Sequence, residues 1–158
     1  MIDTALQWLE ASSWAINIRQ SAWLYPALEI VHIVGIVLVV GPALMFDLRL
    51  LGFGKKLPVL ALSLHLLVWS RRSLLLVIPS GILLFITNAE TLGYDPVFWL
   101  KMILLIVAGL NALLFHRLIF HAASSSDQFK VPGRAKMTAM ISIIVWLATI
   151  TCGRLLAY

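Results

Sequence analysis

The sequence predicts an all-α integral membrane protein: a four-helix bundle of up-down topology, preceded by a short N-terminal interfacial helix. Hydrophobic residues make up 61% of the 158 residues and charged residues 12%, and the mean hydropathy is +0.99. A soluble domain has about 45–50% apolar and about 25% charged residues, so this chain has too few polar side chains to cover a surface in water. Backbone amides in lipid must be paired within their own segment, which favours helices for the four long apolar stretches.

The expected bounds of the spans follow from the thickness of the bilayer. A helix needs about 20 apolar residues to cross about 30 Å of hydrocarbon. The chain offers four such runs and no linker between domains, so we expect one transmembrane domain over residues 1–158. The expected elements are an interfacial helix at about residues 4–18 and spans at about residues 23–47, 60–88, 97–121 and 137–157.

The start of the second span has two interpretations. Leu57–Arg72 either lies in the interface ahead of the span or forms the lower half of one long helix. Residues 73–88 alone would be about 24 Å long as a helix, which is short for a span. We therefore favour one tilted helix of about 28 residues, loosened or kinked at Pro79-Ser80-Gly81.

The basic residues gather at one set of helix ends, whereas the tryptophans Trp8, Trp14 and Trp23 lie at the other. The positive-inside rule makes the basic side cytoplasmic, so we expect a multi-pass protein of a bacterial inner membrane with both termini on the periplasmic side. The same placement accounts for the net charge of +5, and we expect a lipid bilayer and no nucleic acid as partner. The basic residues on the cytoplasmic side are Arg49, Lys55, Lys56, Arg71, Arg72, Arg117, Lys130, Arg134 and Lys136.

His32 is the strongest candidate for a functional residue, because ionisable groups inside a span are costly. Glu29 lies one turn before it on the same face, and Gly35 one turn after it is expected to leave a gap the size of a side chain. An imidazole with a nearby carboxylate and a gap beside it suits haem or metal ligation. The alternative is a histidine that forms a hydrogen bond across the bundle and fixes its packing.

His116 is the expected second ligand of a haem or metal. It follows a stripe of small residues, Ala108, Gly109 and Ala112, which is expected to face the bundle. Counted from the outer helix ends, His32 lies about 14 Å deep and His116 about 28 Å deep, so a shared iron needs tilted or shifted helices. His65 lies closer to the level of His116 if the second helix is long. Both His116 and His121 could instead be solvated residues at the membrane interface.

The other polar residues have structural alternatives. Arg154 either snorkels to the interface, pairs with Glu29 or contacts a haem propionate. Asn111 is expected to form a hydrogen bond between helices, and Asp47 is placed where the first helix leaves the bilayer. Cys152, the only cysteine, is expected to be a packing residue. The chain has no nucleotide-binding glycine loop, HExxH motif or cysteine-based zinc pattern, and we do not favour a stand-alone enzyme.

Five fragments are spread along most of the chain, from residue 27 to residue 158: ALEIVHIVGIVLVVG, DLRLLG, SGILLF, KMILLIVAGLNALLFHR and CGRLLAY. Together they resemble an uncharacterised family of small four-helix bacterial inner-membrane proteins. This resemblance implies the fold and no established activity.

Two further patterns are more distant. Arg71-Arg72, Ser80-Gly81 and Lys101-Met102 with Asn111 resemble copper-resistance D type proteins. His32-Ile33-Val34-Gly35 and Phe115-His116 resemble the four-helix haem-binding protoporphyrinogen oxidase, whose pattern has tyrosine at the place of Phe115. The second resemblance implies that His32 and His116 are haem ligands, whereas Phe115 speaks against the oxidase activity itself.

The leading hypothesis is a b-type haem-binding electron-transfer protein, alone or as a small subunit of a redox complex. His32 and His116 would be iron ligands, with His65, Glu29 and Arg154 as further cofactor-binding candidates. One alternative is copper or small-solute transport along His32, Glu29 and Asn111. The other is a structural subunit of a larger membrane complex or a homo-oligomer.

Overall fold

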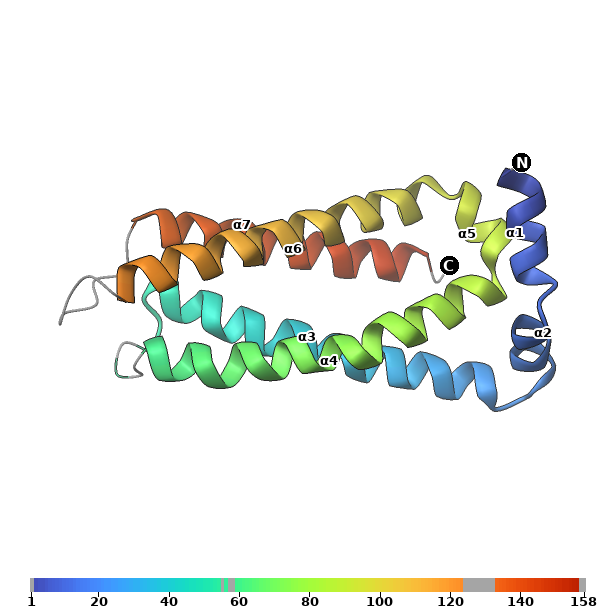
Figure 1. Ribbon diagram of the computed structural model, residues 1–158, viewed down its shortest axis with the longest axis horizontal. Coiled ribbons are helices and arrows are strands. Elements are labelled where there is room, and N and C mark those ends of the chain that lie inside the picture. The colour runs from blue at the N-terminus through green and yellow to red at the C-terminus, as the bar shows by residue number, and fades with distance from the viewer. Residues whose placement is uncertain (1, 55, 57–58, 124–132, 157–158) are drawn as a thin grey trace. The chain divides into compact units, whose positions relative to one another are not determined.

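The computed structural model describes residues 2–54, 56, 59–123 and 133–156, apart from the side chains of residues 2, 60, 61, 116 and 118–123. Within these ranges the chain is helical, with short turns and no strand, so the all-α prediction is confirmed. The helices in chain order are α1 (Ile2–Glu10), α2 (Ser13–Gln20), α3 (Leu24–Leu51), α4 (Val59–Thr87), α5 (Ala89–Tyr94), α6 (Pro96–Ala123) and α7 (Gly133–Leu155) (Figure 1).

Four of these helices are long and apolar enough to cross a membrane, as the predicted bundle requires. The membrane-capable stretches are Leu24–Leu51, Leu62–Thr87, Pro96–Phe115 and Gly133–Leu155. A helix of 28 residues such as α3 is about 42 Å long, which exceeds the hydrocarbon thickness of about 30 Å. The chain is therefore an integral membrane protein. Helix α4 runs from Val59 to Thr87 as one element, the longer of the two arrangements considered for the second span.

The predicted N-terminal helix is divided into two, which corrects the expectation of a single helix at about residues 4–18. Helix α1 ends at Glu10, and Ser12 caps α2 by accepting a hydrogen bond from the backbone N–H of Ala15 at 3.3 Å. A serine at this position stabilises a new helix start, so the chain turns there. Trp8, Trp14 and Trp23 are 73%, 70% and 83% exposed, as expected for aromatic side chains at a membrane interface.

The chain divides into two compact units, and α3 and α4 contribute to both. The first unit comprises residues 1–42 and 67–96, and the second comprises residues 43–66 and 97–158. Helix α3 thus passes into the second unit after Pro42, and α4 enters the first unit at Leu67.

In the first unit, α3 packs closely against α4, and α1 packs against α5 (Figure 1). The Ser70 hydroxyl on α4 donates a hydrogen bond to the Val39 carbonyl on α3 at 2.8 Å. A Cβ atom added to Gly93 on α5 would lie 2.7 Å from Leu6 Cδ1, so this glycine lets α1 approach. Hydrogen bonds between helices and close approach at small residues are the usual means of holding helices together in lipid.

In the second unit, the end of α3 packs with α6 and α7. The rings of Phe46 and Phe115 meet edge to face with centroids 5.2 Å apart. The Asn111 amide donates a hydrogen bond to the Thr138 carbonyl at 3.0 Å, as expected for a helix-helix contact. Ala108 and Phe115 are each 8% exposed and share this face with Asn111.

The predicted small-residue stripe on α6 was partly wrong. Ala108 is buried, but Gly109 and Ala112 are exposed, and a Cβ atom at Gly109 would meet nothing within 4 Å. The inward face follows Ala108, Asn111 and Phe115 instead, at i, i+3 and i+7, which is the spacing of one helix face.

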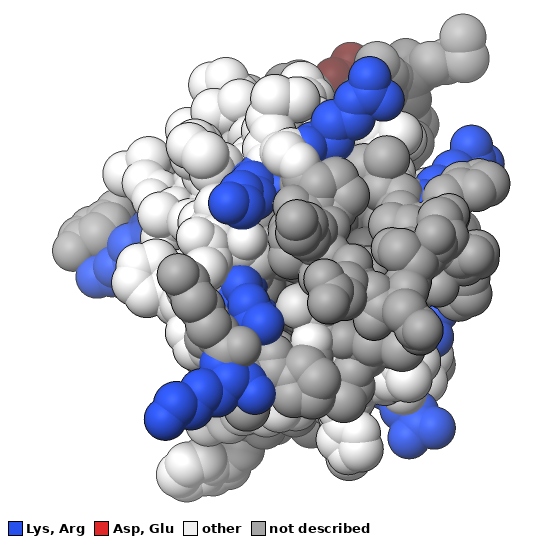
Figure 2. Space-filling model, turned by 90° about the vertical axis from the view of Figure 1, so that its left-hand side faces the viewer, with Lys and Arg blue, Asp and Glu red and all other residues white. Residues whose placement is uncertain are grey.

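The end of the second unit where α6 finishes and α7 begins is rich in basic residues. Figure 2 shows Lys and Arg side chains around this end, with little acidic colour among the described atoms. The exposed basic side chains of the second unit here are Lys56, Arg117, Arg134 and Lys136. This is the side that the positive-inside rule predicts to be cytoplasmic.

Candidate functional site

The candidate site is centred on His32, in the half of α3 that belongs to the first unit. Its Nδ1 atom lies 2.9 Å from the Oγ atom of Ser80 on α4. His32 is half-buried, and Ser80 is 3% exposed. The predicted functional histidine is thus held by a partner on the neighbouring helix.

The Ser80 hydroxyl determines which nitrogen of His32 carries hydrogen. Ser80 Oγ donates its single hydrogen to the Leu76 carbonyl at 2.5 Å, with the Val77 carbonyl at 3.2 Å. Because a hydroxyl has one hydrogen and two lone pairs, Ser80 is left to accept from the Nδ1–H of His32. The neutral imidazole then carries its lone pair on Nε2, which is the atom that a metal or a hydrogen-bond donor would use.

A proline precedes Ser80 and weakens the regular hydrogen bonding of α4 at this point. Pro79 has no N–H and therefore gives no helical hydrogen bond to the Leu75 carbonyl. The serine hydroxyl, in contrast, reaches back to the next carbonyl, that of Leu76. Pro79 and Ser80 together create a place where α4 presents a side-chain acceptor to α3.

Gly81 lets the His32 ring lie against the backbone of α4. A Cβ atom added at Gly81 would lie 3.0 Å from His32 Cε1, 3.6 Å from Nδ1 and 3.9 Å from Nε2. The ring therefore occupies the space that a side chain at position 81 would take. Contact with the backbone on one side and with Ser80 at Nδ1 limits the rotation of the imidazole.

The gap expected beside Gly35 does not exist. A Cβ atom at Gly35 would lie 2.7 Å from Val77 Cγ2 and 3.3 Å from the Val77 backbone N. Helix α4 fills this space, because a glycine in a membrane helix permits close approach of a neighbouring backbone as readily as it leaves room for a cofactor.

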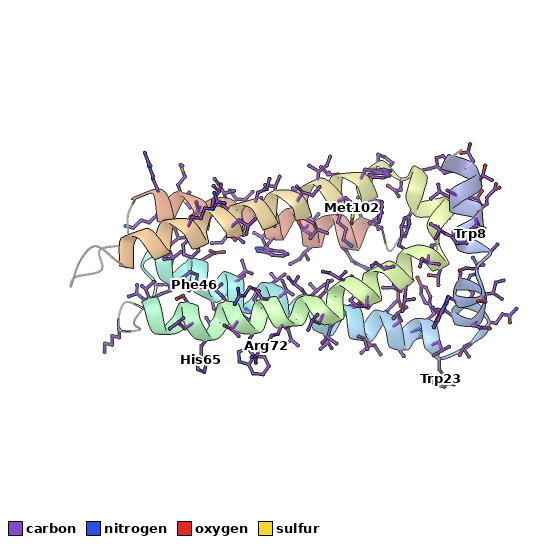
Figure 3. The ribbon with its side chains drawn as sticks, viewed as in Figure 1. Trp8, Trp23, Phe46, His65, Arg72 and Met102 are labelled. Atoms are coloured by element: carbon purple, nitrogen blue, oxygen red, sulfur yellow. The ribbon has the colours of Figure 1, made fainter. Side chains whose placement is uncertain are left out.

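Of the other residues predicted from the sequence, Glu29 belongs to the first unit together with His32, whereas His65, His116 and Arg154 belong to the second unit. Glu29 lies one turn before His32 on α3 and is exposed. His65 lies in the second unit, is exposed, and projects away from α4 (Figure 3). Arg154 is also in the second unit and exposed, on the last turn of α7. His116 lies on α6 after Phe115, and its side chain is outside the described atoms, as is that of His121.

The described residues include no cluster suited to a metal ion, and the first unit has an apolar groove. Among the described residues, no group of three or more His, Cys, Asp and Glu side chains could hold a metal ion. A groove of about 370 Å³ in the first unit is lined by apolar side chains and one amide, with no ionisable group. Its lining residues are Trp14, Asn17, Ile18, Leu24, Leu28 and Leu83.

Sequence reasoning did not single out the burial of Asp47, the residue expected where the first helix leaves the bilayer. Helix α3 continues to Leu51, and Asp47 is 7% exposed in the second unit. Its neighbours Phe46 and Leu50 are each 1% exposed. The signal was present in the sequence, since Val40, Asp47 and Leu50 follow the i, i+7, i+10 spacing of one helix face.

Comparison with known proteins gives one match. A family model described as a family of unknown function (DUF6644) matches residues 6–158. Neither the curated proteins nor the solved structures include a match. The resemblances to copper-resistance D type proteins and to the protoporphyrinogen oxidase therefore rest on the sequence fragments alone.

Proposed function

The chain belongs to the DUF6644 family, whose function is unknown, and we propose from its own residues that it is a b-type haem-binding protein for electron transfer in the membrane. It would act alone or as a small subunit of a redox complex. His32 would help to hold the haem through its imidazole.

The observation that supports this proposal is the hydrogen bond between His32 and Ser80. Histidine ligands of metals usually donate their other ring N–H to an acceptor in the protein, which fixes the tautomer and the orientation of the ring. Ser80 Oγ, at 2.9 Å from Nδ1, is such an acceptor because its own hydrogen goes to Leu76. His32, with this acceptor at Nδ1, would offer its Nε2 atom to the iron of a haem.

The remaining roles are assigned by residue type and place. His116 on α6 is the candidate for the second ligand, and exposed His65 is a weaker one. Glu29, one turn from His32, and the cation Arg154 would affect the charge around the haem. Haem supplies reversible one-electron chemistry at its iron, whereas the residues of this chain bind it, orient it and set its potential.

An optical spectrum of the full chain, purified in mild detergent, tests the proposal. We expect a b-type spectrum that changes on reduction with dithionite and a pyridine haemochrome of fixed stoichiometry. His32→Ala should lose the signal, whereas Arg72→Ala, which removes an exposed side chain of α4 with no proposed haem role, should keep it. Protein that stays colourless after supplementation with haem would refute the proposal, as would full haem content in His32→Ala.

Ser80→Ala and Gly81→Ala test the assignment more finely, without removing the ligand. Loss of the Nδ1–H acceptor in Ser80→Ala makes the imidazole a poorer electron donor, so we expect a higher reduction potential at similar haem content. A Cβ at position 81 would push on the His32 ring at 3.0 Å, so Gly81→Ala should lower the haem content. An unchanged reduction potential in Ser80→Ala would show that Ser80 does not tune the proposed haem ligand.

The second candidate is a structural subunit of a larger membrane complex. The close approach at Gly35 and the bonds from Ser70 to Val39 and between Ser80 and His32 favour it, because they hold α3 to α4 without any ligand. On this alternative, His32→Ala lowers thermal stability in a protein that never binds haem. Co-purification of the full chain with a partner of fixed stoichiometry from native membranes would support it.

Copper or small-solute transport remains the third candidate. In the structure Glu29 is exposed and the Asn111 amide donates to the Thr138 carbonyl, so neither residue provides a specific observation for transport. Copper accumulation in a deletion strain, with and without a plasmid copy carrying His32→Ala, distinguishes it from the haem proposal.

A further inference from the structure

Asp47 is a buried carboxyl group with one oxygen atom that lacks a partner. It lies near the end of α3 in the second unit and is 7% exposed. Its Oδ2 atom has no hydrogen-bond partner among the described residues. Phe46 and Leu50, both 1% exposed, flank it on α3, and the Phe46 ring contacts Phe115 on α6. The carboxyl group is thus buried beside apolar side chains.

The polar partner that the structure gives to Asp47 is the side chain of Ser142 on α7. A hydroxyl can donate one hydrogen, so Ser142 serves one of the two carboxyl oxygens. An ionised carboxylate in an apolar interior is costly unless it is paired and fully hydrogen-bonded. One hydroxyl does not meet that requirement.

The described basic side chains of the surrounding elements are exposed or lie on another face of their helix. Arg49 is two residues further along α3 and lies about 200° around the helix from it. The described basic side chains at this end of α6 and α7 are exposed: Arg117, Arg134 and Lys136. Lys56, which precedes α4, and His65 on α4 are exposed as well. The next position after Phe115 on α6 is His116, whose side chain lies outside the described atoms.

The donor set distinguishes between a metal cation and a proton as the ligand. Calcium takes six to eight oxygen ligands, and magnesium demands near-octahedral geometry. Asp47 and Ser142 supply too few oxygens for either, whereas a proton needs one oxygen. A proton on Oδ2 also removes the buried charge, which is the larger part of the cost.

We propose that Asp47 is a reversible proton-binding site in the second unit. In the buried state the carboxyl is neutral, with Oδ2–H as its protonated oxygen and Ser142 bonded to the other oxygen. When the carboxyl reaches water, the O–H bond breaks, the proton passes to water and a carboxylate remains. The exposed basic side chains at this end of the unit favour that carboxylate (Figure 2). The proposal does not depend on haem.

Infrared spectroscopy of the full chain in detergent, in H₂O and in D₂O, tests the site directly. A protonated carboxyl has a carbonyl stretching band that is absent from a carboxylate and that shifts on exchange to D₂O. We expect this band at neutral pH in the wild type and its loss in Asp47→Asn. Glu29→Gln, which changes an exposed carboxyl on the same helix, should leave the band unchanged.

A second variant keeps the carboxyl in place, in case Asp47→Asn does not fold. Ser142→Ala removes the hydrogen-bond partner and should shift the Asp47 carbonyl band to higher frequency. Thr151→Ala removes a hydroxyl on α7 that bonds within its own helix to the Leu147 carbonyl, and should not shift the band. Absence of the band at neutral pH in the wild type, or a band that both Asp47→Asn and Ser142→Ala leave unchanged, would overturn the proposal.

Thermal unfolding gives an independent readout. Because the folded state holds a proton that the unfolded state has released, the melting temperature of the wild type should fall as the pH rises above the ordinary range of aspartate, about pH 4. Asn is a neutral amide of similar shape, so Asp47→Asn should lack this part of the pH dependence. Identical pH dependence of the two proteins would count against a proton at Asp47.

Discussion

Gly35 of α3 lies so close to Val77 of α4 that a Cβ atom at position 35 would come within 2.7 Å of the valine Cγ2 and 3.3 Å of its backbone N. Close packing of this kind brings two helix backbones together and strengthens the dispersion contacts that drive helix association in lipid. The Ser70–Val39 hydrogen bond of 2.8 Å joins the same two helices. The pairing of α3 and α4 in the first unit therefore depends on small residues as well as on apolar side chains.

Substitution of Gly35 by alanine tests this contact. The added methyl group has no room, so Gly35→Ala should lower the free energy of unfolding by about 1–3 kcal/mol, the usual cost of overpacking. Gly109→Ala is the matched control, because a Cβ there meets nothing within 4 Å. It should be neutral or stabilising by up to about 1 kcal/mol, since alanine is the better helix former. Tryptophan fluorescence during heating in detergent measures both; equal shifts would contradict the packing argument.

Arg19 connects three helices of the first unit and gives a second prediction. Its Nη1 atom donates to Glu10 Oε1 at 2.8 Å and to the Thr87 carbonyl at 3.1 Å, and its Nη2 atom donates to the Glu10 carbonyl at 2.5 Å. Exposed ion pairs contribute about 1 kcal/mol or less, so we expect local opening rather than global unfolding in Arg19→Ala.

Limited proteolysis of the purified chain measures this opening. Arg19→Ala should be cut faster within residues 1–20 than the wild type, and Arg19→Lys should recover only part of the protection, because lysine cannot form the same fork of hydrogen bonds. Arg72→Ala, which removes an exposed arginine from α4, is the control. Equal cleavage of the Arg19→Ala and Arg72→Ala variants would show that Arg19 does not hold α1 and α2.

The distribution of basic residues predicts the orientation in the membrane. Thr91 on α5 is exposed and stands between the second and third spans in sequence, whereas exposed Lys56 stands in the basic connection between the first and second spans. In a Cys152→Ser background, a membrane-impermeant maleimide should label Thr91→Cys in spheroplasts and Lys56→Cys only after permeabilisation. Labelling with the opposite sidedness would reverse the topology.

The spans were predictable from sequence because lipid imposes a long apolar run and internal hydrogen bonding. The face that each helix turns toward the bundle was harder to predict from the sequence. On α6 the small residues Gly109 and Ala112 pointed to the wrong face, since almost every residue there is apolar and the hydrophobic pattern carries little directional information. The inward face became clear only through the neighbours of Ala108, Asn111 and Phe115.

At the candidate site, too, single residues could be predicted from the sequence, whereas their partners could not. His32 was identifiable as an ionisable residue within a span, but its partner Ser80 is 48 residues away and could not be assigned without the pairing of α3 with α4. Gly35 allowed both a gap and a close contact, and Val77 decided between them. The burial of Asp47 was not evident from the sequence, because Arg49 nearby suggests a polar helix end, whereas α3 continues to Leu51 and Asp47 is 7% exposed.

Helices α3 and α4 each belong to both compact units. About four backbone hydrogen bonds bridge any point along an α-helix, because each N–H bonds to a carbonyl four residues earlier. Melting of one unit would therefore fray two helices of the other. The shared helices make the units energetically interdependent through continuous backbone, and heating should unfold them in one cooperative transition.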